Sequence, residues 1–138
     1  MTLELVPLGT MTVILRKPIV LRGTPSGERR IVEVESGEIT GDRFNATLEG
    51  FAAADWMTLS ADGTATLDVR ALVRTDDGAL IYVSYGGRAD FSKGMSSLYS
   101  TPRFETGDER YGWLNRIQAV GKGELSGATL RYELYELK

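Results

Sequence analysis

Four polar residues near the middle of the chain have the types and spacing needed to bind and polarise an oxygenated small molecule. Asp68 and Arg70 lie two positions apart, and Tyr82 and Ser84 follow after a turn sequence at 76–78. On neighbouring strands, their side chains would share one face. Such a group could move a proton and stabilise negative charge on oxygen. The alternative is an ion pair and solvent-facing polar groups on an ordinary hairpin.

A hairpin is the element that would place these residues together. Residues 64–74 alternate between an apolar set at odd positions and a largely polar set at even positions, which is typical of a strand. Gly78 suits the last position of a hairpin loop, where positive φ is needed. The predicted register pairs Thr75 with Ala79, Leu72 with Tyr82, Arg70 with Ser84 and Asp68 with Gly86. The pattern does not decide which face of 64–74 points inward.

A second candidate group lies between positions 105 and 115. Glu105 could act as a general base in a buried setting. Tyr111, Trp113 and Asn115 alternate, so on an extended strand they would form one wall of a ligand pocket. The alternative is that both aromatic side chains are ordinary core, and that Asn115 and Glu105 bind backbone groups.

A third candidate is the pair Asp55-Trp56, which follows a short run of alanines. Trp56 could close one end of a barrel and contact a substrate there. The alternative is a tryptophan in the core beside an aspartate in an exposed turn.

The composition excludes several classes of chemistry. The chain has no Cys and no His, which excludes thiolate nucleophiles, Ser-His-Asp catalysis and sites that depend on Cys or His ligands. A metal would need oxygen ligands, and calcium-loop spacing is absent, so we predict no metal and no cofactor. The net charge of −3 gives no electrostatic case for nucleic acid. With no apparent signal peptide or membrane span, we expect a cytoplasmic protein that does not bind membranes.

Short strands and glycine-rich turns predominate along the 138 residues. They predict an all-β fold, an antiparallel sandwich or barrel that forms a single domain over residues 1–138. A barrel is favoured because closure removes exposed sheet edges. Further predicted elements are strands at 11–21 (broken by Pro18), 31–35, 44–48, 111–120 and 128–137, one helical turn at 52–55, and a long loop at 87–103.

A series of short motifs resembles domain-of-unknown-function family 3237, also called uncharacterised protein family 0311. The likeness covers nearly the whole chain. The motifs that carry it are Pro7-Leu8-Gly9, Asp55-Trp56, Asp62-Gly63, Leu67-Asp68-Val69-Arg70, Thr75 to Tyr82, Gly86-Gly87-Arg88, Phe104-Glu105-Thr106-Gly107 and Tyr111-Gly112-Trp113-Leu114-Asn115.

The resemblance implies a compact antiparallel β-barrel with a central cavity and no established common activity. The recurring polar residues of the family would correspond here to Asp68, Arg70, Tyr82, Glu105, Trp113 and Asn115. Residues 42–55 and 99–103 depart from the family pattern. Both stretches would flank the cavity mouth, so the departures concern the identity of the substrate.

The sequence therefore favours a small-molecule-binding barrel that acts as a cofactor-free isomerase, cyclase or lyase on an oxygenated, aromatic or polyketide-like substrate. The expected catalytic residues are Asp68, Glu105 and Arg70, and the expected substrate-binding residues are Trp56, Tyr82, Arg88, Tyr111, Trp113 and Asn115. Two alternatives are a lipocalin-like protein that binds a ligand without turnover, and a homo-oligomeric structural module. A homodimer is compatible with all three hypotheses.

Overall fold

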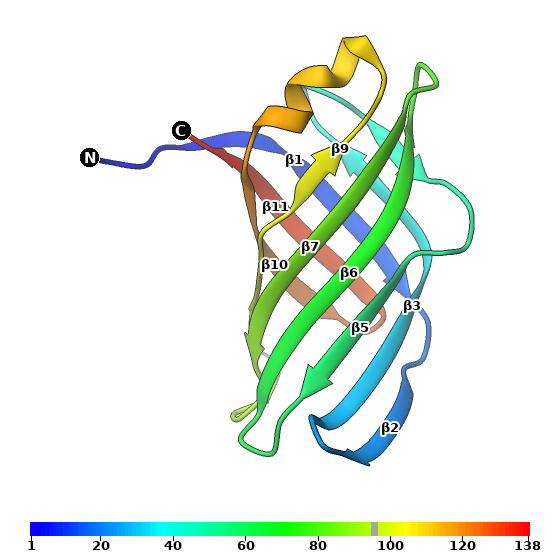
Figure 1. Ribbon diagram of the computed structural model, residues 1–138, viewed down its shortest axis with the longest axis vertical. Helices are drawn as coiled ribbons and strands as arrows, with labels where there is room; N and C mark the ends of the chain where they lie inside the picture. Colours follow the sequence, from blue (N-terminus) through cyan, green and yellow to red (C-terminus); the bar gives the residue numbers. More distant parts are fainter. Residues whose placement is uncertain (95–96) are drawn as a thin grey trace.

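The computed structural model describes residues 1–94 and 97–138 and forms an antiparallel β-barrel (Figure 1). Within these residues, eight strands close into a ring, because β6 pairs with β7 as well as with β5. The predicted all-β barrel is confirmed. In order around the ring, the strands are β6 (Thr64–Thr75), β5 (Ala54–Leu59), β3 (Gly27–Thr40), β1 (Leu5–Leu15), β11 (Thr129–Leu137), β10 (Ala119–Ser126), β8 (Leu98–Ser100) and β7 (Leu80–Asp90).

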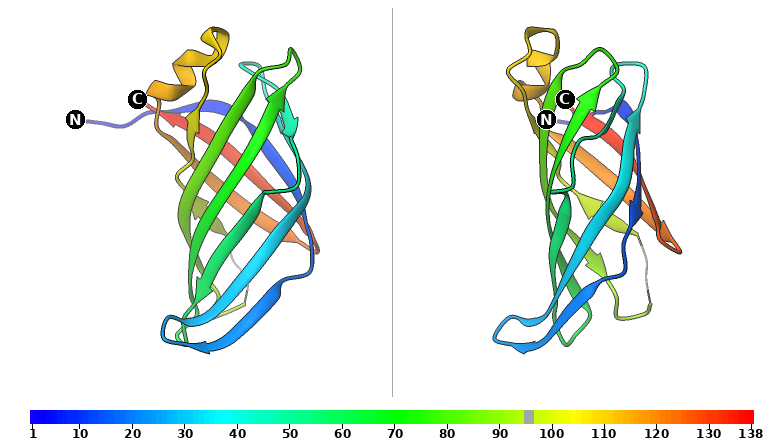
Figure 2. Two further views of the ribbon diagram at one scale, coloured as in Figure 1. Left: turned by 45° about the vertical axis from the view of Figure 1, so that its right-hand side comes forward. Right: turned by 90° about the vertical axis from the view of Figure 1, so that its right-hand side faces the viewer.

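Shorter elements lie at the two ends of the barrel (Figure 2). At one end, β2 (Ile19–Thr24) pairs with β3 and with no other strand of the described residues, and it extends beyond the barrel. At the other end lie β4 (Ala46–Leu48), β9 (Arg103–Glu105) and a 3-10 helix, η1 (Glu109–Arg116). No helix in the described part of the chain is long and apolar enough to cross a membrane.

The predicted hairpin is confirmed pair by pair. β6 and β7 pair without a break from Thr64↔Asp90 to Arg74↔Leu80, and the register includes Leu72↔Tyr82 and Arg70↔Ser84. The odd positions of β6 face the barrel interior, since Ala65, Leu67, Val69 and Val73 are buried. The polar even face of this strand therefore lies outside.

Three predicted elements differ from the structure. Residues 87–103 were expected as one long loop, but β7 continues to Asp90 and the chain then forms β8 and β9; positions 95 and 96 lie outside the described residues. Residues 111–120 were expected as a strand, but most of them belong to η1. The reason is the cap at Asp108, whose side chain accepts a hydrogen bond from the Arg110 backbone N–H and starts the helix. The expected helical turn at 52–55 is also wrong, because β5 begins at Ala54.

The barrel closes through β8, a strand of only 3 residues that bridges β7 and β10. Gly87 makes this closure possible. A Cβ atom at Gly87 would collide with the backbone carbonyl oxygen of Tyr99, whereas a Cβ at Gly86 would meet only the Leu67 carbonyl at an ordinary 3.6 Å.

Gly87→Ala should therefore destabilise the protein by about 2 kcal/mol, as is usual when an atom is forced into a packed position. Gly86→Ala is the matched control and should change stability by less than about 0.5 kcal/mol. Urea unfolding of the two variants beside the wild type measures the difference. Equal stabilities for both variants would show that β8 can move aside without cost.

Candidate functional site

An apolar cavity of about 400 Å³ lies inside the half of the barrel away from η1. Its mouth is marked by exposed residues of two connections, 16–18 between β1 and β2 and 127–128 between β10 and β11. The walls are mostly aliphatic and aromatic. The wall residues between the mouth and the core are Val13, Leu15, Val32, Val34, Met57, Val69, Phe91, Leu98, Leu125 and Leu130, and the polar groups along the lining are Arg16, Lys17, Arg30, Asp55, Tyr85 and Tyr132.

Asp55 is the carboxylate of this cavity, and an opening in the β5–β6 ladder holds it. The backbone pairing of these two strands stops at Asp55↔Val69 and resumes at Thr58↔Thr66. In the gap, Oδ1 of Asp55 accepts a hydrogen bond of 3.0 Å from the backbone N–H of Asp68. The carbonyl of Trp56 accepts instead from Nη1 of Arg29, at 3.0 Å. Side chains therefore replace the missing backbone pairs and fix the carboxyl group in place.

Burial raises the pKa of Asp55 to about 6, because the charged form loses solvation in the apolar cavity. The hydrogen bond from the Asp68 backbone lowers the pKa by less, and the nearby Asp68 carboxylate adds a further rise. A carboxyl group with a pKa near 6 can both donate and accept a proton near neutral pH, which is what general acid–base catalysis requires.

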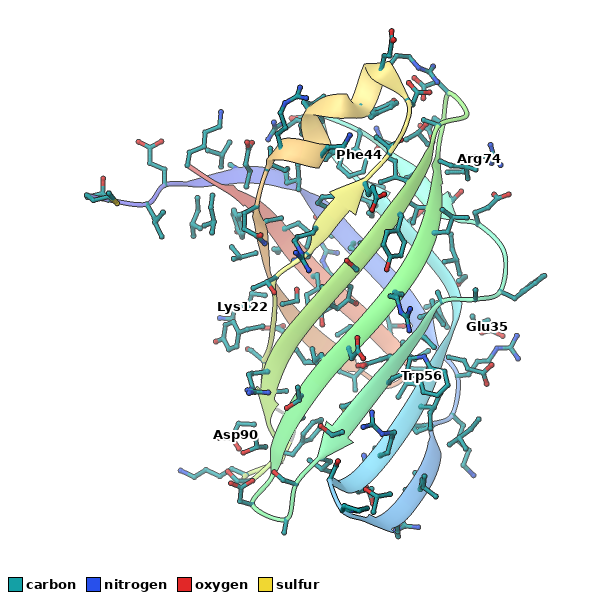
Figure 3. The ribbon with its side chains drawn as sticks, viewed as in Figure 1. Glu35, Phe44, Trp56, Arg74, Asp90 and Lys122 are labelled. Carbon is teal, nitrogen blue, oxygen red and sulfur yellow. The ribbon has the colours of Figure 1, made fainter. Side chains whose placement is uncertain are left out.

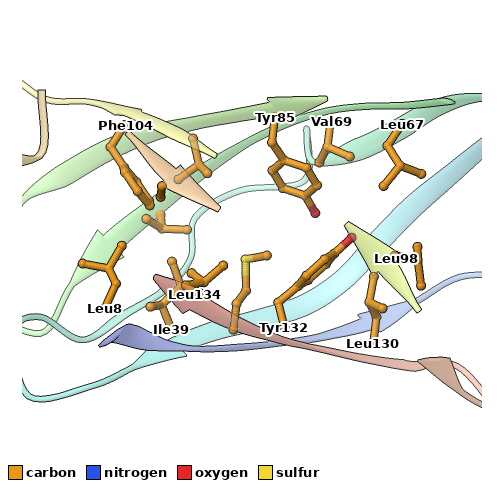
Figure 4. Close-up of a cluster of buried hydrophobic side chains, with 14 of the residues drawn as sticks. Leu8, Ile39, Leu67, Val69, Tyr85, Leu98, Phe104, Leu130, Tyr132 and Leu134 are labelled. Atoms are coloured by element: carbon orange, nitrogen blue, oxygen red, sulfur yellow. The ribbon is translucent and has the colours of Figure 1, made fainter. Parts of the chain in front are cut away.

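Two phenols stand beside this carboxyl group. Tyr85 on β7 and Tyr132 on β11 are both buried, and their rings meet edge to face with centroids 5.8 Å apart. Their hydroxyl groups point toward each other across the interior (Figure 4). Burial is the main cause that raises the pKa of both phenols. The charge of Asp55 raises the pKa of each further. Both therefore stay protonated at neutral pH. The Tyr85 hydroxyl donates to that of Tyr132, which leaves the Tyr132 O–H to donate to an oxygen atom of a ligand.

The position of Tyr132 depends on a glycine across the ladder. Gly123 of β10 pairs with Tyr132, and a Cβ atom there would lie 2.6 Å from Cε1 of the ring. The ring therefore lies over a strand segment with no side chain. Close approach of this kind is a common role of glycine within a strand.

The residues predicted around the hairpin lie on the outer surface. Asp68, Arg70 and Tyr82 are exposed and line a polar groove on the outside of the barrel, together with Ser84 and Arg103. The sequence left open which face of β6 points inward, and the structure places the polar face outside, because the apolar odd positions of β6 and β7 take the inner face. The catalytic and binding roles predicted for these residues in an interior cavity therefore do not fit their positions. Glu105 of β9 is exposed as well, opposite Tyr82 in the β7–β9 register.

The residues predicted near 111–115 close the other end of the barrel. Trp113 packs edge to face on Phe44 at 6.2 Å, and the Arg43 guanidinium lies 4.4 Å from its ring. The Tyr111 hydroxyl donates to the Asp77 carboxylate at 2.9 Å. These side chains do not line the cavity, and the single strand face predicted for them is absent because η1 turns them in different directions.

Asn115 satisfies backbone groups, as the alternative interpretation of the sequence held. Its Oδ1 accepts from the Thr106 N–H at 2.8 Å, and its Nδ2 donates to the Thr106 carbonyl at 3.0 Å. This pair of hydrogen bonds fixes the loop that leads into η1.

Trp56 and Arg88 also lie outside the cavity. Trp56 is 47% exposed on the outer face of β5, next to the inward-facing Asp55 (Figure 3). Arg88 is exposed on β7 and its guanidinium donates to the Thr66 hydroxyl. Neither interpretation of Trp56 fits, because it lies outside the barrel. The alternative is also wrong about Asp55, which lines the cavity and is not in an exposed turn.

Sequence reasoning names Asp55 and its neighbouring tryptophan as a candidate pair but does not place Asp55 with Tyr85 and Tyr132, although the sequence contains a signal for this group. Asp55, Met57 and Leu59 alternate, so a strand at this position places one carboxylate in phase with apolar residues. Tyr85 and Tyr132 likewise fall in phase with the apolar positions of their strands. No group of three or more acidic side chains that could hold a metal ion occurs among the described residues.

The comparisons with known proteins agree with the fold and the motifs. A model of the family described as "Protein of unknown function (DUF3237)" matches residues 3–137, which confirms the predicted resemblance. The crystal structure of a β-barrel like protein from Acinetobacter baumannii superposes with a TM-score of 0.90 at 30% sequence identity, over 100% of this chain and 98% of that one.

Two relatives are similar to this chain in sequence. A UPF0311 protein of Clostridium acetobutylicum is 28% identical over 121 residues, which cover 76% of this chain and 75% of the relative. A protein of Penicillium herquei named hydroalkoxylation enzyme phnH is 35% identical over 85 residues, which are 62% of this chain. The match spans 50% of that relative's length.

Proposed function

The chain belongs to the DUF3237 family, and from this premise and the geometry of the cavity we propose that it is an enzyme in which Asp55 carries out acid–base catalysis. The observation that carries the proposal is a carboxyl group with a pKa of about 6 inside an apolar cavity, beside two protonated phenols. Pockets of this size with few polar groups suit small organic ligands. The substrate class is an apolar molecule that bears an oxygen function.

The reaction class is an isomerisation or cyclisation that needs no external reagent. Protonated Asp55 gives its proton to a carbon of a C=C bond, and a hydroxyl oxygen of the same substrate bonds to the neighbouring carbon. The hydroxyl proton then returns to the Asp55 carboxylate, so the product is an isomer of the substrate. Tyr132, which accepts a hydrogen bond from Tyr85, orients the substrate oxygen by donating its own. The name of the Penicillium herquei relative supports this class, since hydroalkoxylation adds an O–H group across a double bond.

A panel of phenols with alkenyl side chains tests the proposal, because these molecules contain both reacting groups. The purified protein is incubated with each compound, and the mixture is analysed for an isomer of unchanged mass. Formation of an isomer supports catalysis. If some compounds bind tightly but every compound of the panel is recovered unchanged, the result instead supports a ligand-binding protein without turnover.

Val69→Phe should abolish binding and turnover of any compound found in this way. Val69 lies between Asp55 and Tyr85 in the strand register, and its side chain lines the cavity. A phenyl ring there fills the space that the ligand needs. Leu72→Phe is the matched control on the same strand, because Leu72 is 36% exposed and faces outward.

Isothermal titration with the best compound measures both variants, and circular dichroism confirms their folding. We expect binding to be lost in Val69→Phe and kept in Leu72→Phe. If Leu72→Phe loses binding and Val69→Phe keeps it, the proposal is contradicted and the ligand binds on the outer surface.

A further inference from the structure

The inner face of β3 changes from apolar to charged along its length. Val34 and Val32 line the cavity wall, Arg30 follows on the same face, and Glu28 comes next. The strand register fixes this orientation, because Arg30 pairs with the inward-facing Met57 and Val32 pairs with Asp55. A guanidinium on the inner face of a barrel strand needs an explanation, since arginine is mostly found at the protein surface.

Glu28 holds Arg30 in a defined position. Nε of Arg30 lies 2.5 Å from Oε2 of Glu28, and the two side chains are only 32% and 19% exposed. One edge of the guanidinium is thus engaged, while its side chain still forms part of the cavity lining. Its other N–H groups have no hydrogen-bond partner among the described residues, so they are available for a planar, bidentate partner such as a carboxylate.

Two further cations stand at the same opening. Arg16 and Lys17 lie in the connection between β1 and β2 and line the cavity mouth. Neither of them forms an ion pair with any residue that the structure describes. The mouth is therefore positive on a chain whose net charge is −3. Among the described residues that line the cavity behind the mouth, the polar side chains are Asp55, Tyr85 and Tyr132.

We propose that the ligand is an amphipathic carboxylate, with its apolar body inside the barrel and its carboxylate bound by Arg30, Arg16 and Lys17 at the mouth. This inference rests on the proposed function, because it assigns a substrate class to the same cavity. The opposite orientation would bury an anion beside Asp55 in apolar surroundings, which is costly.

The register also sets the length of the ligand. Arg30 lies two residues before Val32 in β3, and Val32 is the partner of Asp55. Two residues of a strand span about 7 Å. The ligand must therefore extend past at least this length of β3 to reach from the basic mouth to Asp55. The ligand spans from the basic mouth to the carboxyl group in the interior.

A matched pair of fluorescent probes tests the charge requirement. The probes are 1-pyrenebutyrate, which carries a carboxylate, and 1-pyrenebutanol, which has the same body and a neutral end. The wild type should bind the carboxylate about tenfold more tightly, as expected for a hydrogen-bonded charge. Arg30→Gln should remove this preference, so that the two probes bind the variant with similar affinities.

Two further variants complete the test. The double variant Arg16→Gln/Lys17→Gln changes only exposed side chains, and should also weaken carboxylate binding without harming the fold. Arg131→Gln removes the same charge from the outer face of β11, and should leave the affinities for both probes unchanged.

The outcomes separate this inference from the proposed function. If both probes bind the wild type equally and none of the variants alters the ratio, the cavity binds ligands but the carboxylate class is wrong. If neither probe binds, the cavity itself takes no ligand of this size, and the inference and the proposed function both fail. A loss of carboxylate preference in Arg131→Gln equal to that in Arg30→Gln would reduce the effect to net charge, and would overturn the inference.

Discussion

Asp55→Asn should raise the free energy of unfolding by about 3 kcal/mol at pH 8 and leave it almost unchanged at pH 4. The pKa of Asp55 is about 6 in the folded protein, against an ordinary value of 3.8. Between these two values the folded state binds more protons than the unfolded state. The stability of the wild type therefore falls as pH rises through this window, and above it the full cost of the buried charge remains. The amide pays no such cost at any pH.

The measurement is urea unfolding of the wild type and the variant at several pH values from 4 to 8. The difference between the two proteins isolates Asp55, because all other titrating groups are common to both. Asn can still accept the hydrogen bond from the Asp68 backbone, so local geometry is preserved. Glu35→Gln is the control, since Glu35 is an exposed carboxylate on the outside of β3 (Figure 3). A variant less stable than the wild type at pH 8 would show that the charge stabilises the fold.

The expected gain in stability of Asp55→Asn is also evidence about the function of Asp55. A carboxylate that lowers stability near neutral pH has no structural reason to be where it is, because an amide would make the same backbone contact at lower cost. Natural proteins place such destabilising groups mainly at functional sites. The rise in stability on removing Asp55 is thus an argument for its role that does not depend on knowing the substrate.

The sequence predicted the β6–β7 hairpin in full because two local signals agreed. Strict alternation at 64–74 defined the strand, and Gly78 at positive φ defined the turn, so the register followed. The closed barrel followed from the number of short strands. By contrast, η1 was missed because Tyr111, Trp113 and Asn115 alternate by coincidence. The hydrogen bonds that fold this segment back come from Asp108 and from the contacts of Asn115 with Thr106, which periodicity does not reveal.

The site was harder to predict, for a physical reason. Candidate residues were sought where polar groups cluster, and polar groups cluster on the outside of a barrel. The inner face carries few of them, so each appears in the sequence as a single exception within an apolar pattern. Asp55 is such an exception, in phase with the apolar Met57 and Leu59 on the inner face of β5. Only the ring closure, which turns β5 and β11 toward each other, shows that Asp55 and Tyr132 belong to one cavity.

Turnover of any substrate should fall by about 10²- to 10⁴-fold in Asp55→Asn, the usual contribution of a positioned acid or base. Ligand binding should persist, because the amide has nearly the same shape as the carboxyl group. If protonated Asp55 starts the reaction, kcat/KM of the wild type is constant below about pH 6 and falls tenfold per pH unit above it. A reaction that starts with the ionised carboxylate gives the mirror-image profile. In either case the residual rate of the variant should lose this pH dependence.

The two outer carboxylates provide the decisive comparison. Asp68→Asn and Glu105→Gln remove the groups that the sequence favoured as catalytic, and both lie outside the cavity. If either change abolishes turnover while Asp55→Asn retains it with an unaltered pH profile, the reaction takes place on the outer face and the cavity assignment is wrong. If only Asp55→Asn abolishes turnover, the chemistry lies inside the barrel. The three variants each remove one acidic proton-transfer group, so the comparison distinguishes the two faces of the sheet.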